Sequence, residues 1–403
     1  MRFVYIDENF SDAGGHNADY ALGILSACEK REHSCAIYAN RRLDSSFLSF
    51  SGIIPVFSIK TSTLHQIGLG RGLGRLGQAM RLAYSNISHG LDLLRKVNIG
   101  KDCSLVLIAG ISPRVTLAYL VWFAYLSLIG MRTNIAILLH DQAPGFAGLE
   151  LRLLRMAGFR QKIDFAAQSP SIAEQFRIRF HEPICIMPMP MVDHSRRKPS
   201  AEGAGQIRKE KINVLYLGLA SSAKGFGFLV DTLTSCRAID ALGGALKFTI
   251  QYNPVKGDEL AKQAGERLSA AAESCHMITV LRGPLAKDAY ETQLVMADVM
   301  ILPYDPRCYR YIQSGIITQA IAAGKPLIVS ADSNLEKEMQ LHGSGISFEY
   351  GSPASFMDAL CHLVDNLDDF SGKAALKSAA YLQMHGPAAY VAKMEAMATG
   401  RPE

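Results

Sequence analysis

Short apolar runs alternate with longer stretches of helical periodicity along this chain, and the alternation occurs in two successive series. The first series of strand-like runs covers 2–7, 35–40, 53–59, 104–110, 134–141, 164–169 and 184–190. The second series covers 212–219, 246–253, 277–283, 299–304, 326–330 and 345–350. Continuously apolar runs separated by helices are typical of parallel sheets that helices cover on both faces. The pattern therefore predicts an α/β chain built from two doubly wound, Rossmann-like domains.

A charged segment, DHSRRKPSAEGAGQIRKEK at 193–211, separates the two series and has no apolar periodicity. This composition indicates an interdomain linker. We expect an N-terminal domain at 1–192, a C-terminal domain at 212–375, and a helical tail at 376–403 that is a candidate to pack back on the N-terminal domain. Ligands of doubly wound domains bind at the carboxyl ends of the strands, so the cleft between two facing domains is the expected site.

The charge and cysteine content argue against several classes of function. The 403 residues carry a net charge of +5, which is too small for a typical nucleic-acid-binding protein but suits an anionic small molecule or an anionic membrane surface. The eight cysteines show no paired spacing, which argues against a zinc site or a disulfide scaffold and favours reduced thiols in the cytosol. The opening sequence MRFVYIDENF does not resemble a signal peptide. We expect a cytoplasmic protein.

In the first domain, the candidate site residues stand where strands end. Gly14, Gly15 and His16 follow the first strand and precede a helix, so bare backbone and the free N–H groups of a helix start could hold an anion. A tight strand-to-helix turn would account for the same glycines. His140 and Asp141 end the strongly apolar run NIAILLHD, and this position would direct them into the cleft.

In the second domain, Lys224 follows Gly218 and a short loop at a strand-to-helix turn, where a compact cation suits a diphosphate. A solvated surface lysine is the alternative. Ser314 and Gly315 offer a hydroxyl and unpaired N–H groups at a helix start. One turn later, the amide of Gln319 can bind a vicinal diol. An ordinary serine N-cap with a solvent-facing glutamine would explain the same residues.

Several motifs of metal-dependent and nucleophilic catalysis are missing from the sequence. It contains no Asp-x-Asp, His-Glu-x-x-His, Gly-x-Ser-x-Gly or Walker lysine loop. Clustered carboxylates that would chelate a metal-bound diphosphate are therefore not indicated. We expect neither a metal nor a cofactor, and we expect Lys224 and helix N-termini to meet the charge of a leaving phosphate.

Two segments are candidates for membrane contact. The Gly-rich segment 71–81 carries arginines among leucines, which suits anionic lipid or an anionic acceptor. A Gly-rich surface loop that leads into an ordinary helix fits this segment as well. The segment 116–131 is the most apolar part of the chain but is too short to span a bilayer, so we expect a buried or membrane-grazing helix there.

Most of the chain resembles the GT-B glycosyltransferases known as family 4 or group 1. The C-terminal half carries the most specific resemblance, in LYLGLASSAKGFGFLVDTL, in the block 277–330 and in GSGISFEYGSPASFMDAL. In the N-terminal half, the turn at 14–16, LLHD and AAQSPSIAEQF are similar but less specific. The resemblance implies the GT-B fold and transfer of a sugar from a nucleotide-diphosphate donor, held mainly by the second domain, to an acceptor held mainly by the first.

The resemblance also implies roles for individual residues. Lys224 would hold the donor diphosphate and stabilise the departing charge, and His140 would contact the donor sugar near the reacting carbon. The distal phosphate would lie on the N–H groups of 314–316, and the base would border the turn at 282–283. The other residues implied to bind the donor are Gly14, Gly15, Gly218, Arg282, Gly283, Tyr311, Ser314, Gly315, Ile316 and Gln319, with His16 and Asp141 on the acceptor side of the cleft. Members of this family are retaining and metal-independent.

Positions 219, 311 and 319 depart from the family pattern. The arginine that often follows the first-strand glycine is Leu219 here. The family commonly has two glutamates eight positions apart, and Tyr311 and Gln319 occupy those positions here. Gln319 can bind ribose hydroxyls only through neutral hydrogen bonds, which are about half as strong as charge-assisted ones. The sequence YRYIQSG is closer to a Tyr-x-x-x-Ser-Gly subgroup, whose members often work in polysaccharide or lipopolysaccharide assembly.

We therefore predict a retaining hexosyltransferase that acts at the cytosolic face of the membrane on a glycan or lipid-linked acceptor. Two alternatives stay open at this point. The missing carboxylates would also fit a sugar-nucleotide-binding scaffold that is catalytically weak or inactive. A sugar-nucleotide epimerase of GT-B fold would use the same donor and need no acceptor.

Overall fold

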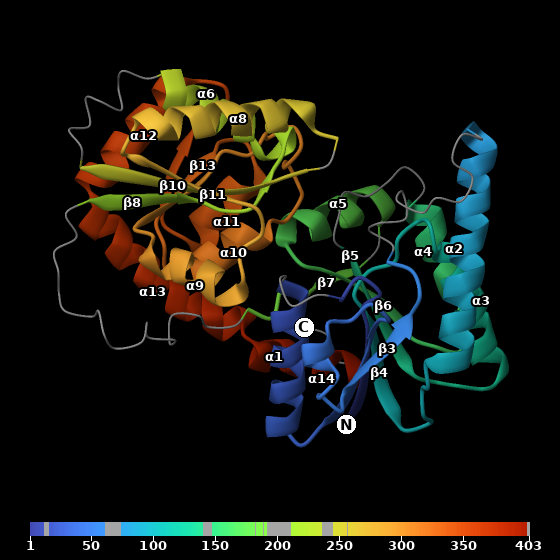
Figure 1. Ribbon diagram of the computed structural model, residues 1–403. Coiled ribbons are helices and arrows are strands. Elements are labelled where there is room, and N and C mark those ends of the chain that lie inside the picture. The colour runs from blue at the N-terminus through green and yellow to red at the C-terminus, as the bar shows by residue number, and fades with distance from the viewer. Residues whose placement is uncertain are drawn as a thin grey trace. The chain divides into compact units, whose positions relative to one another are not determined.

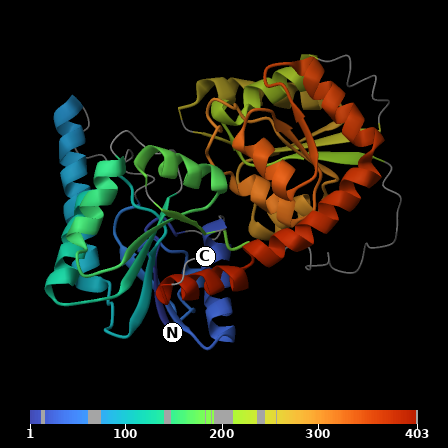
Figure 2. The same cartoon turned by 180° about the vertical axis from the view of Figure 1, so that it is seen from behind.

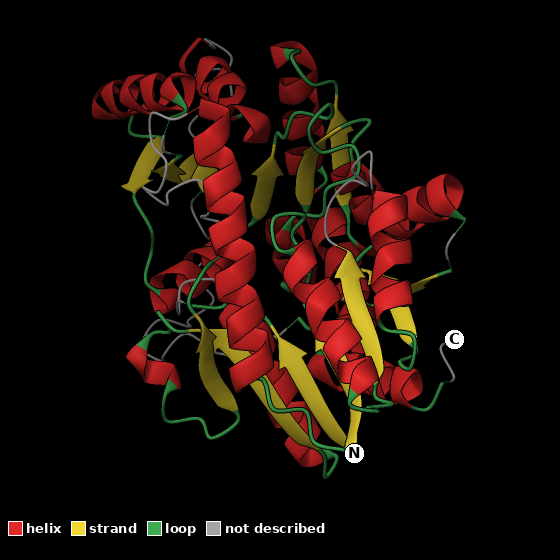
Figure 3. Ribbon diagram, turned by 90° about the vertical axis from the view of Figure 1, so that its right-hand side faces the viewer, coloured by secondary structure: helices red, strands yellow, loops and turns green. Residues whose placement is uncertain are grey.

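The chain folds into two compact units, which are described separately. Unit 1 consists of Met1–Pro190 and Pro387–Glu403, and unit 2 consists of Met191–Gly386. Each unit is a parallel β-sheet with helices packed against it, as Figures 1 and 3 show. The computed structural model describes residues 1–11, 16–60, 74–139, 147–181, 183–187, 189–191, 211–235, 245–255 and 257–400.

The sheet of unit 1 has seven parallel strands in the order β3-β2-β1-β4-β5-β6-β7. Its strands are β1 (Arg2–Ile6), β2 (Ser34–Asn40), β3 (Ile53–Phe57), β4 (Cys103–Ile108), β5 (Asn134–Leu139), β6 (Ile163–Ala167) and β7 (Ile184–Ile186). The strand order reverses between β1 and β4, which is where ligands of doubly wound sheets bind. In β1, Val4 and Ile6 enter one core while Phe3 and Tyr5 enter another on the opposite face. Burial on both faces explains why these runs are continuously apolar.

Helices cover both faces of this sheet. The helices of unit 1 are α1 (His16–Lys30), η1 (Ser45–Phe47), α2 (Gly74–Lys96), α3 (Thr116–Leu128), α4 (Ala147–Ala157), α5 (Pro170–Phe180) and α14 (Pro387–Ala398). One core lies under α2, α3, α4 and α5 and includes Leu93, Trp122 and Phe176. The opposite core lies under α1 and α14 and includes Ile24 and Met394.

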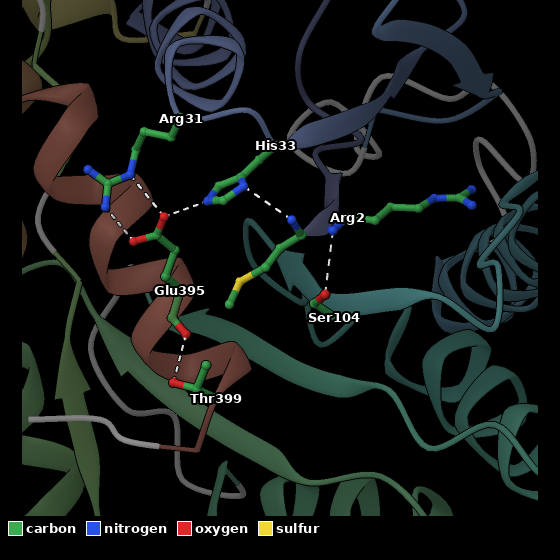
Figure 4. Close-up of polar contacts among 7 residues, drawn as sticks. Arg2, Arg31, His33, Ser104, Glu395 and Thr399 are labelled. Atoms are coloured by element: carbon green, nitrogen blue, oxygen red, sulfur yellow. Dashed lines mark hydrogen bonds and ion pairs between the residues drawn. The ribbon is translucent and has the colours of Figure 1, made fainter.

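The C-terminal helix α14 is an integral part of unit 1. It packs beside α1 and β4, next to the blue N-terminal elements in Figure 2. Figure 4 shows how its Glu395 is held: the Arg31 guanidinium donates to both carboxylate oxygens at 2.9 and 2.6 Å, and His33 Nε2 lies 2.5 Å from Oε1. At the end of the helix, Asn134 Nδ2 donates to the carbonyl oxygen of Ala398 at 2.7 Å. These contacts join α14 to the turn between α1 and β2 and to the start of β5.

Removing the carboxylate charge with Glu395→Gln should destabilise unit 1 near neutral pH. The hydrogen bond and charge of Arg31 lower the pKa of Glu395 to about 2, so the carboxylate stabilises the fold above its unfolded pKa and loses this effect as the pH falls towards 2. Because the ion pair is partly exposed, we expect a loss of about 1–2 kcal/mol at pH 7. Chemical denaturation at pH 7 and pH 4 measures it, and a difference between the two proteins that grows on acidification would contradict this assignment.

The sheet of unit 2 is also parallel, with the strand path β11-β10-β8-β12-β13-β14 and a short strand β9 beside β10. Its strands are β8 (Ile212–Tyr216), β9 (Leu219–Ala220), β10 (Leu246–Pro254), β11 (Ile278–Arg282), β12 (Val299–Leu302), β13 (Leu327–Ser330) and β14 (Gly345–Phe348). The strand order reverses at β8, between β10 and β12. The carboxyl end of β8 is therefore the place in this unit where a ligand is expected.

The helices of unit 2 again lie on both faces of the sheet (Figure 1). They are η3 (Ser222–Lys224), α6 (Phe226–Ser235), α8 (Glu259–Ser274), α9 (Lys287–Met296), α10 (Gly315–Ala322), α11 (Asn334–His342), α12 (Pro353–Asp365) and α13 (Leu367–His385). The helices α6, α8 and α12 bury Leu229, Leu268 and Leu360 in one core with the strands. The helices α10, α11 and α13 pack against one another.

Some boundaries differ from the sequence-based expectations. The run 184–190 forms a strand only at Ile184–Ile186, and the prolines that follow in the sequence lack the N–H that a ladder requires. The expected domain end at residue 375 falls inside α13, which belongs to unit 2, and the chain rejoins unit 1 at Pro387. The linker expected at 193–211 lies outside the described residues except for Lys211. Among the described residues, no helix has both the length and the apolar character needed to cross a membrane.

Candidate functional site

Lys224 lies in a tightly built turn between β9 and α6. The Ser221 hydroxyl accepts a hydrogen bond from the Lys224 N–H at 3.3 Å and so caps the N-terminus of the short helix η3. Gly225 follows with φ +63°, and a Cβ at this position would collide with the carbonyl oxygen of Pro303. Glycine is therefore needed at residue 225, both for its backbone conformation and for its close approach to the end of β12. The Asp305 N–H, which donates to the Ala223 carbonyl at 3.0 Å, fixes the turn from the same side.

The side chain of Lys224 is a half-buried cation. Its Nζ lies 5.3 Å from the centroid of the buried Tyr304 ring. Within the parts of the chain that the structure describes, it has neither a carboxylate partner nor a hydrogen-bond acceptor. Burial lowers the pKa of Lys224 to about 8. A cation that is partly desolvated and lacks a counter-ion is suited to bind an anion from outside the protein.

Gly218 and the start of α10 lie against this lysine. A Cβ built on Gly218 would lie 3.5 Å from Lys224 Nζ and 3.9 Å from the Ile316 side chain. Ser314 is the buried N-cap of α10, and its hydroxyl does not cap the helix. Burial raises the pKa of the Tyr304 phenol well above its usual range, while the neighbouring Ser314 side chain opposes that rise. The structure thus brings Gly218, Lys224 and the first turn of α10 together, as an anion site requires.

Gln319 lies one turn further along α10 and is held by a residue that carried no signal in the sequence. The Tyr290 hydroxyl, on α9, donates to Gln319 Oε1 at 2.5 Å. This bond occupies the carbonyl side of the amide and leaves the Nε2 hydrogens as the group that Gln319 can offer to a ligand. Tyr290 lies in KDAYETQLVM, an ordinary helical stretch without a recognisable motif.

A buried glutamine connects two of the predicted backbone positions. Gln251, on β10, accepts the Gly218 N–H at 2.8 Å and donates through Nε2 to the Gly283 carbonyl at 2.6 Å. Gly283 itself has φ +84°, and its N–H donates to the Tyr252 carbonyl at 2.9 Å. One side chain therefore sets the spacing between the carboxyl ends of β8 and β11, across the intervening strand β10.

Replacing Gln251 with methionine should loosen this connection while keeping a similar side-chain volume. The change leaves the Gly218 N–H and the Gly283 carbonyl without their partner, so we expect a loss of about 1–3 kcal/mol in the free energy of unfolding. Chemical denaturation measures it, with Gln263→Met on the exposed side of α8 as the matched control. Equal stability of the two variants would show that Gln251 does not hold the two glycines.

The loop before α10 is anchored on α11. Asn334 Nδ2 donates to Gln313 Oε1 at 2.8 Å. The carboxyl of Glu338 is buried, and burial raises its pKa to about 7, although a hydrogen bond with Gln313 acts in the opposite direction. Neither Asn334 nor Glu338 was singled out from the sequence, because both come from a helix beyond the next strand. Together they fix the residue that directly precedes the Ser314 cap.

Two other predicted residues of unit 2 make contacts that lie apart from Lys224. The Arg282 side chain is exposed, and its Nε donates to Ser269 Oγ on α8 at 3.1 Å. The half-buried Tyr311 ring has Lys337 Nζ at 5.9 Å and the Arg310 guanidinium at 5.6 Å from its centroid. The position of the first family glutamate is thus occupied by an aromatic ring with cationic neighbours.

The predicted residues of the N-terminal half lie almost entirely outside the described residues. Gly14, Gly15, His140 and Asp141 belong to this group. His16 is the first residue of α1, and its side chain is not among the described ones. Their proposed contacts with donor and acceptor stay predictions. The candidate site that can be built from contacts is therefore the anion site of unit 2.

Comparison with known proteins identifies the architecture. No protein-family model matches the sequence, and no curated protein is significantly similar to it. Solved structures match nearly the whole chain. The N-terminal domain of trehalose-6-phosphate phosphatase from Candida albicans is 11% identical with a TM-score of 0.69, and the match covers 98% of this chain and 97% of that one. Sucrose-phosphate synthase from Thermosynechococcus elongatus is 13% identical with a TM-score of 0.66, over 99% and 98%.

A further match is HepE from Anabaena, whose structure was solved in complex with UDP-glucose. It is 14% identical with a TM-score of 0.63, and the match covers 99% of this chain and 100% of HepE. At such low identity, these likenesses concern the fold. Together with the two parallel sheets, they confirm the fold predicted from the sequence: this chain has the GT-B fold.

Proposed function

We propose that this protein is a retaining, metal-independent glycosyltransferase that moves a hexose-type sugar from a nucleotide-diphosphate sugar to a glycan or lipid-linked acceptor in polysaccharide or lipopolysaccharide assembly. The observation that carries the proposal is Lys224, a half-buried cation without an anionic partner among the described residues, beside Gly218 and the start of α10. A diphosphate is the anion that such a site fits. The UDP-glucose bound to the structural neighbour HepE supports a nucleotide sugar as its source.

In this proposal, each part of the site has one role. Lys224 and the N–H groups of 314–316 hold the diphosphate. The amide hydrogens of Gln319, oriented by the bond from Tyr290, donate to a ribose hydroxyl oxygen. Gln251 holds the backbone at Gly218 and Gly283 in place, so that the donor meets a preformed surface.

The reaction that we propose is a front-face displacement. The bond between the anomeric carbon and the leaving phosphate oxygen breaks, and the acceptor oxygen bonds to the same face of that carbon. The proton of the acceptor hydroxyl passes to the leaving phosphate oxygen. Lys224 and the positive end of α10 stabilise the negative charge that develops on the diphosphate. The donor sugar and the acceptor would be held in part by residues of the N-terminal half, with His140 near the reacting carbon.

A transfer assay tests this proposal. The protein is incubated with a panel of radiolabelled nucleotide sugars and with glycan and lipid-linked acceptors, with and without EDTA. We expect transfer from one donor with retention of the anomeric configuration and no loss of rate in EDTA. Binding of nucleotide diphosphates with neither transfer nor slow donor hydrolysis would reject the enzymatic function. Loss of transfer in EDTA would reject its metal independence.

A binding scaffold with weak or no turnover is the second candidate, because Tyr311 and Gln319 replace both family carboxylates. The variant Gln319→Glu separates the two functions. A glutamate can still accept the hydrogen bond of Tyr290, and it adds a charge-assisted bond to ribose that is worth roughly 1 kcal/mol more than a neutral one. Transfer that is already present in the native protein and changes only a few-fold favours the enzyme. Transfer that appears only in the variant favours the scaffold.

A further inference from the structure

The solvent-facing side of α3 is entirely apolar. Its exposed side chains are Leu117, Val121, Tyr125 and Leu128, and Leu128 is 76% exposed. The opposite side enters the core of unit 1 with Trp122 and other aromatic and aliphatic residues. The helix contains no charged residue. A surface helix normally presents polar residues to water, so an outward apolar stripe indicates a contact surface.

The two helices beside α3 extend this surface. The N-terminal end of α3 is tied to α2 through Asn86, whose Oδ1 accepts the Ala118 N–H at 3.0 Å. Its C-terminal end is tied to α4 through Ser127, whose hydroxyl donates to the Ala157 carbonyl at 3.1 Å. In Figure 1 these three helices lie side by side, and α2 is the long helix that faces the viewer in Figure 3. We call their exposed apolar side chains the apolar face.

Each neighbour contributes a stripe at helical spacing. In α2 the stripe is Leu76, Met80, Tyr84, Ile87, Leu91 and Leu94. In α4 it is Leu149, Leu153 and Met156. Both stripes recur every three or four residues and point away from the core residues Leu93 and Leu154 of the same helices. The apolar face therefore comes from three helices that pack side by side, and it is not a set of scattered exposed residues.

Basic residues border the apolar face. They are Arg75 and Arg81 on α2, Arg114 and Arg132 on either side of α3, and Arg152 and Arg160 on or after α4. The described residues 74–139 and 147–162 contain only three acidic residues. Of these, Asp92 is buried against Arg41 and Lys96, and Asp102 is paired with Arg2. Glu150 is half-buried, and burial raises its pKa.

We propose that the apolar face docks on an anionic lipid bilayer. The leucines, Val121 and the tyrosines enter the boundary between headgroups and acyl chains, while the bordering arginines bind lipid phosphates. A second copy of the chain fits this surface less well, because two such faces would bring arginines against arginines without carboxylates between them. The inference goes beyond sugar transfer, and it holds whether or not the protein turns over a donor. The apolar face includes described residues of both segments expected to contact a membrane, 71–81 and 116–131, and it extends to α4.

Vesicle co-sedimentation of the full chain tests the proposal. We expect the protein to pellet with vesicles that contain phosphatidylglycerol but not with pure phosphatidylcholine, and to be released by salt. The double variant Val121→Gln, Leu128→Gln should reduce vesicle affinity about tenfold or more, because two exposed apolar side chains would no longer leave water when the protein binds. The control variant Leu260→Gln, Leu376→Gln changes two leucines of unit 2 that are at least as exposed as Val121, and it should bind like the native protein.

A second double variant measures how much the arginines contribute to vesicle binding. Arg114→Ala, Arg132→Ala should weaken binding to anionic vesicles and reduce its dependence on salt, whereas Lys262→Ala, Lys373→Ala on unit 2 should not. Far-ultraviolet circular dichroism establishes that all variants fold. The proposal is overturned if the native protein does not bind vesicles, or if the variant Val121→Gln, Leu128→Gln binds as well as its control on unit 2. It is also overturned if the protein forms a dimer in solution that the variant Val121→Gln, Leu128→Gln dissociates. Because the assay contains no nucleotide sugar, its failure would leave the proposed function intact.

Discussion

Replacing Lys224 with alanine is expected to reduce kcat for sugar transfer by about 10²–10³, while nucleotide-diphosphate binding weakens less. The reason is that the leaving diphosphate carries more charge in the transition state than in the bound donor, and the lysine is the half-buried cation beside it. Steady-state kinetics with the donor identified in the transfer assay measures both quantities. Because the Lys224 side chain makes neither an ion pair nor a hydrogen bond among the described residues and contacts only the Tyr304 ring, its removal should change the melting temperature little, which provides the control for folding.

The pH profile of the same reaction should show the titration of the Lys224 ammonium group. Burial lowers the pKa of Lys224 to about 8, so kcat/KM for the free enzyme is expected to fall as the pH rises through this value. Lys224→Arg retains the charge at all accessible pH values because guanidinium titrates far above this range. The variant should therefore be slower but should lose the alkaline decline. An unchanged kcat in Lys224→Ala, or the same alkaline decline in Lys224→Arg, would assign the leaving-group charge to another residue.

Acidification should destabilise unit 1 well before its carboxylates titrate, because of a buried histidine. His89, on α2, is 1% exposed, stacks on Phe57 with ring centroids 4.8 Å apart, and has no hydrogen-bond partner for either ring nitrogen among the described residues. Burial lowers the pKa of His89 to about 4. The unfolded chain takes up a proton near pH 6.5 and the folded chain only near pH 4. Stability is therefore complete above pH 6.5 and falls by about 3 kcal/mol between these values.

His89→Phe tests this assignment because phenylalanine keeps the stacked ring but cannot be protonated. We expect the variant to be at least as stable as the native protein at pH 7 and to lose less stability between pH 6.5 and pH 4, as measured by chemical denaturation. His276→Phe serves as the control, since His276 is exposed on unit 2. If the native protein and His89→Phe lose stability in parallel over this range, the buried imidazole is not the group that titrates.

The fold could be predicted because its signals are local and repeated. Every strand-like run of the sequence corresponds to a strand, since burial on both sheet faces makes each run continuously apolar. Strand ends were less predictable. β7 is short because prolines follow it, and α13 continues past the expected domain end because nothing in the local sequence stops the helix there. The boundary is set by which core each helix enters, and this depends on tertiary contacts and not on the local sequence.

The candidate site was predictable only in part. Lys224, Gly218 and the Ser314–Gly315 cap could be found, because glycines and a lysine at strand-to-helix turns have a direct relation to anion binding. Tyr290 and Gln251 could not be found in this way. They act through tertiary contacts with Gln319 and with two glycine backbones, and their own neighbours in sequence are ordinary helix and strand. A residue that positions another leaves no pattern of its own in the chain.

The return of α14 to unit 1 has a consequence for synthesis of the protein. Proteins grow from the N-terminus, and domains generally fold as their residues emerge from the ribosome. The core under α1 needs Tyr390, Val391, Met394 and Met397, which follow the whole of unit 2 in the chain. Until then, the part of the first sheet that α14 covers stays exposed while unit 2 is made. The unit that begins first is therefore the one that finishes last, and a nascent chain cut before Pro387 should depend on chaperones.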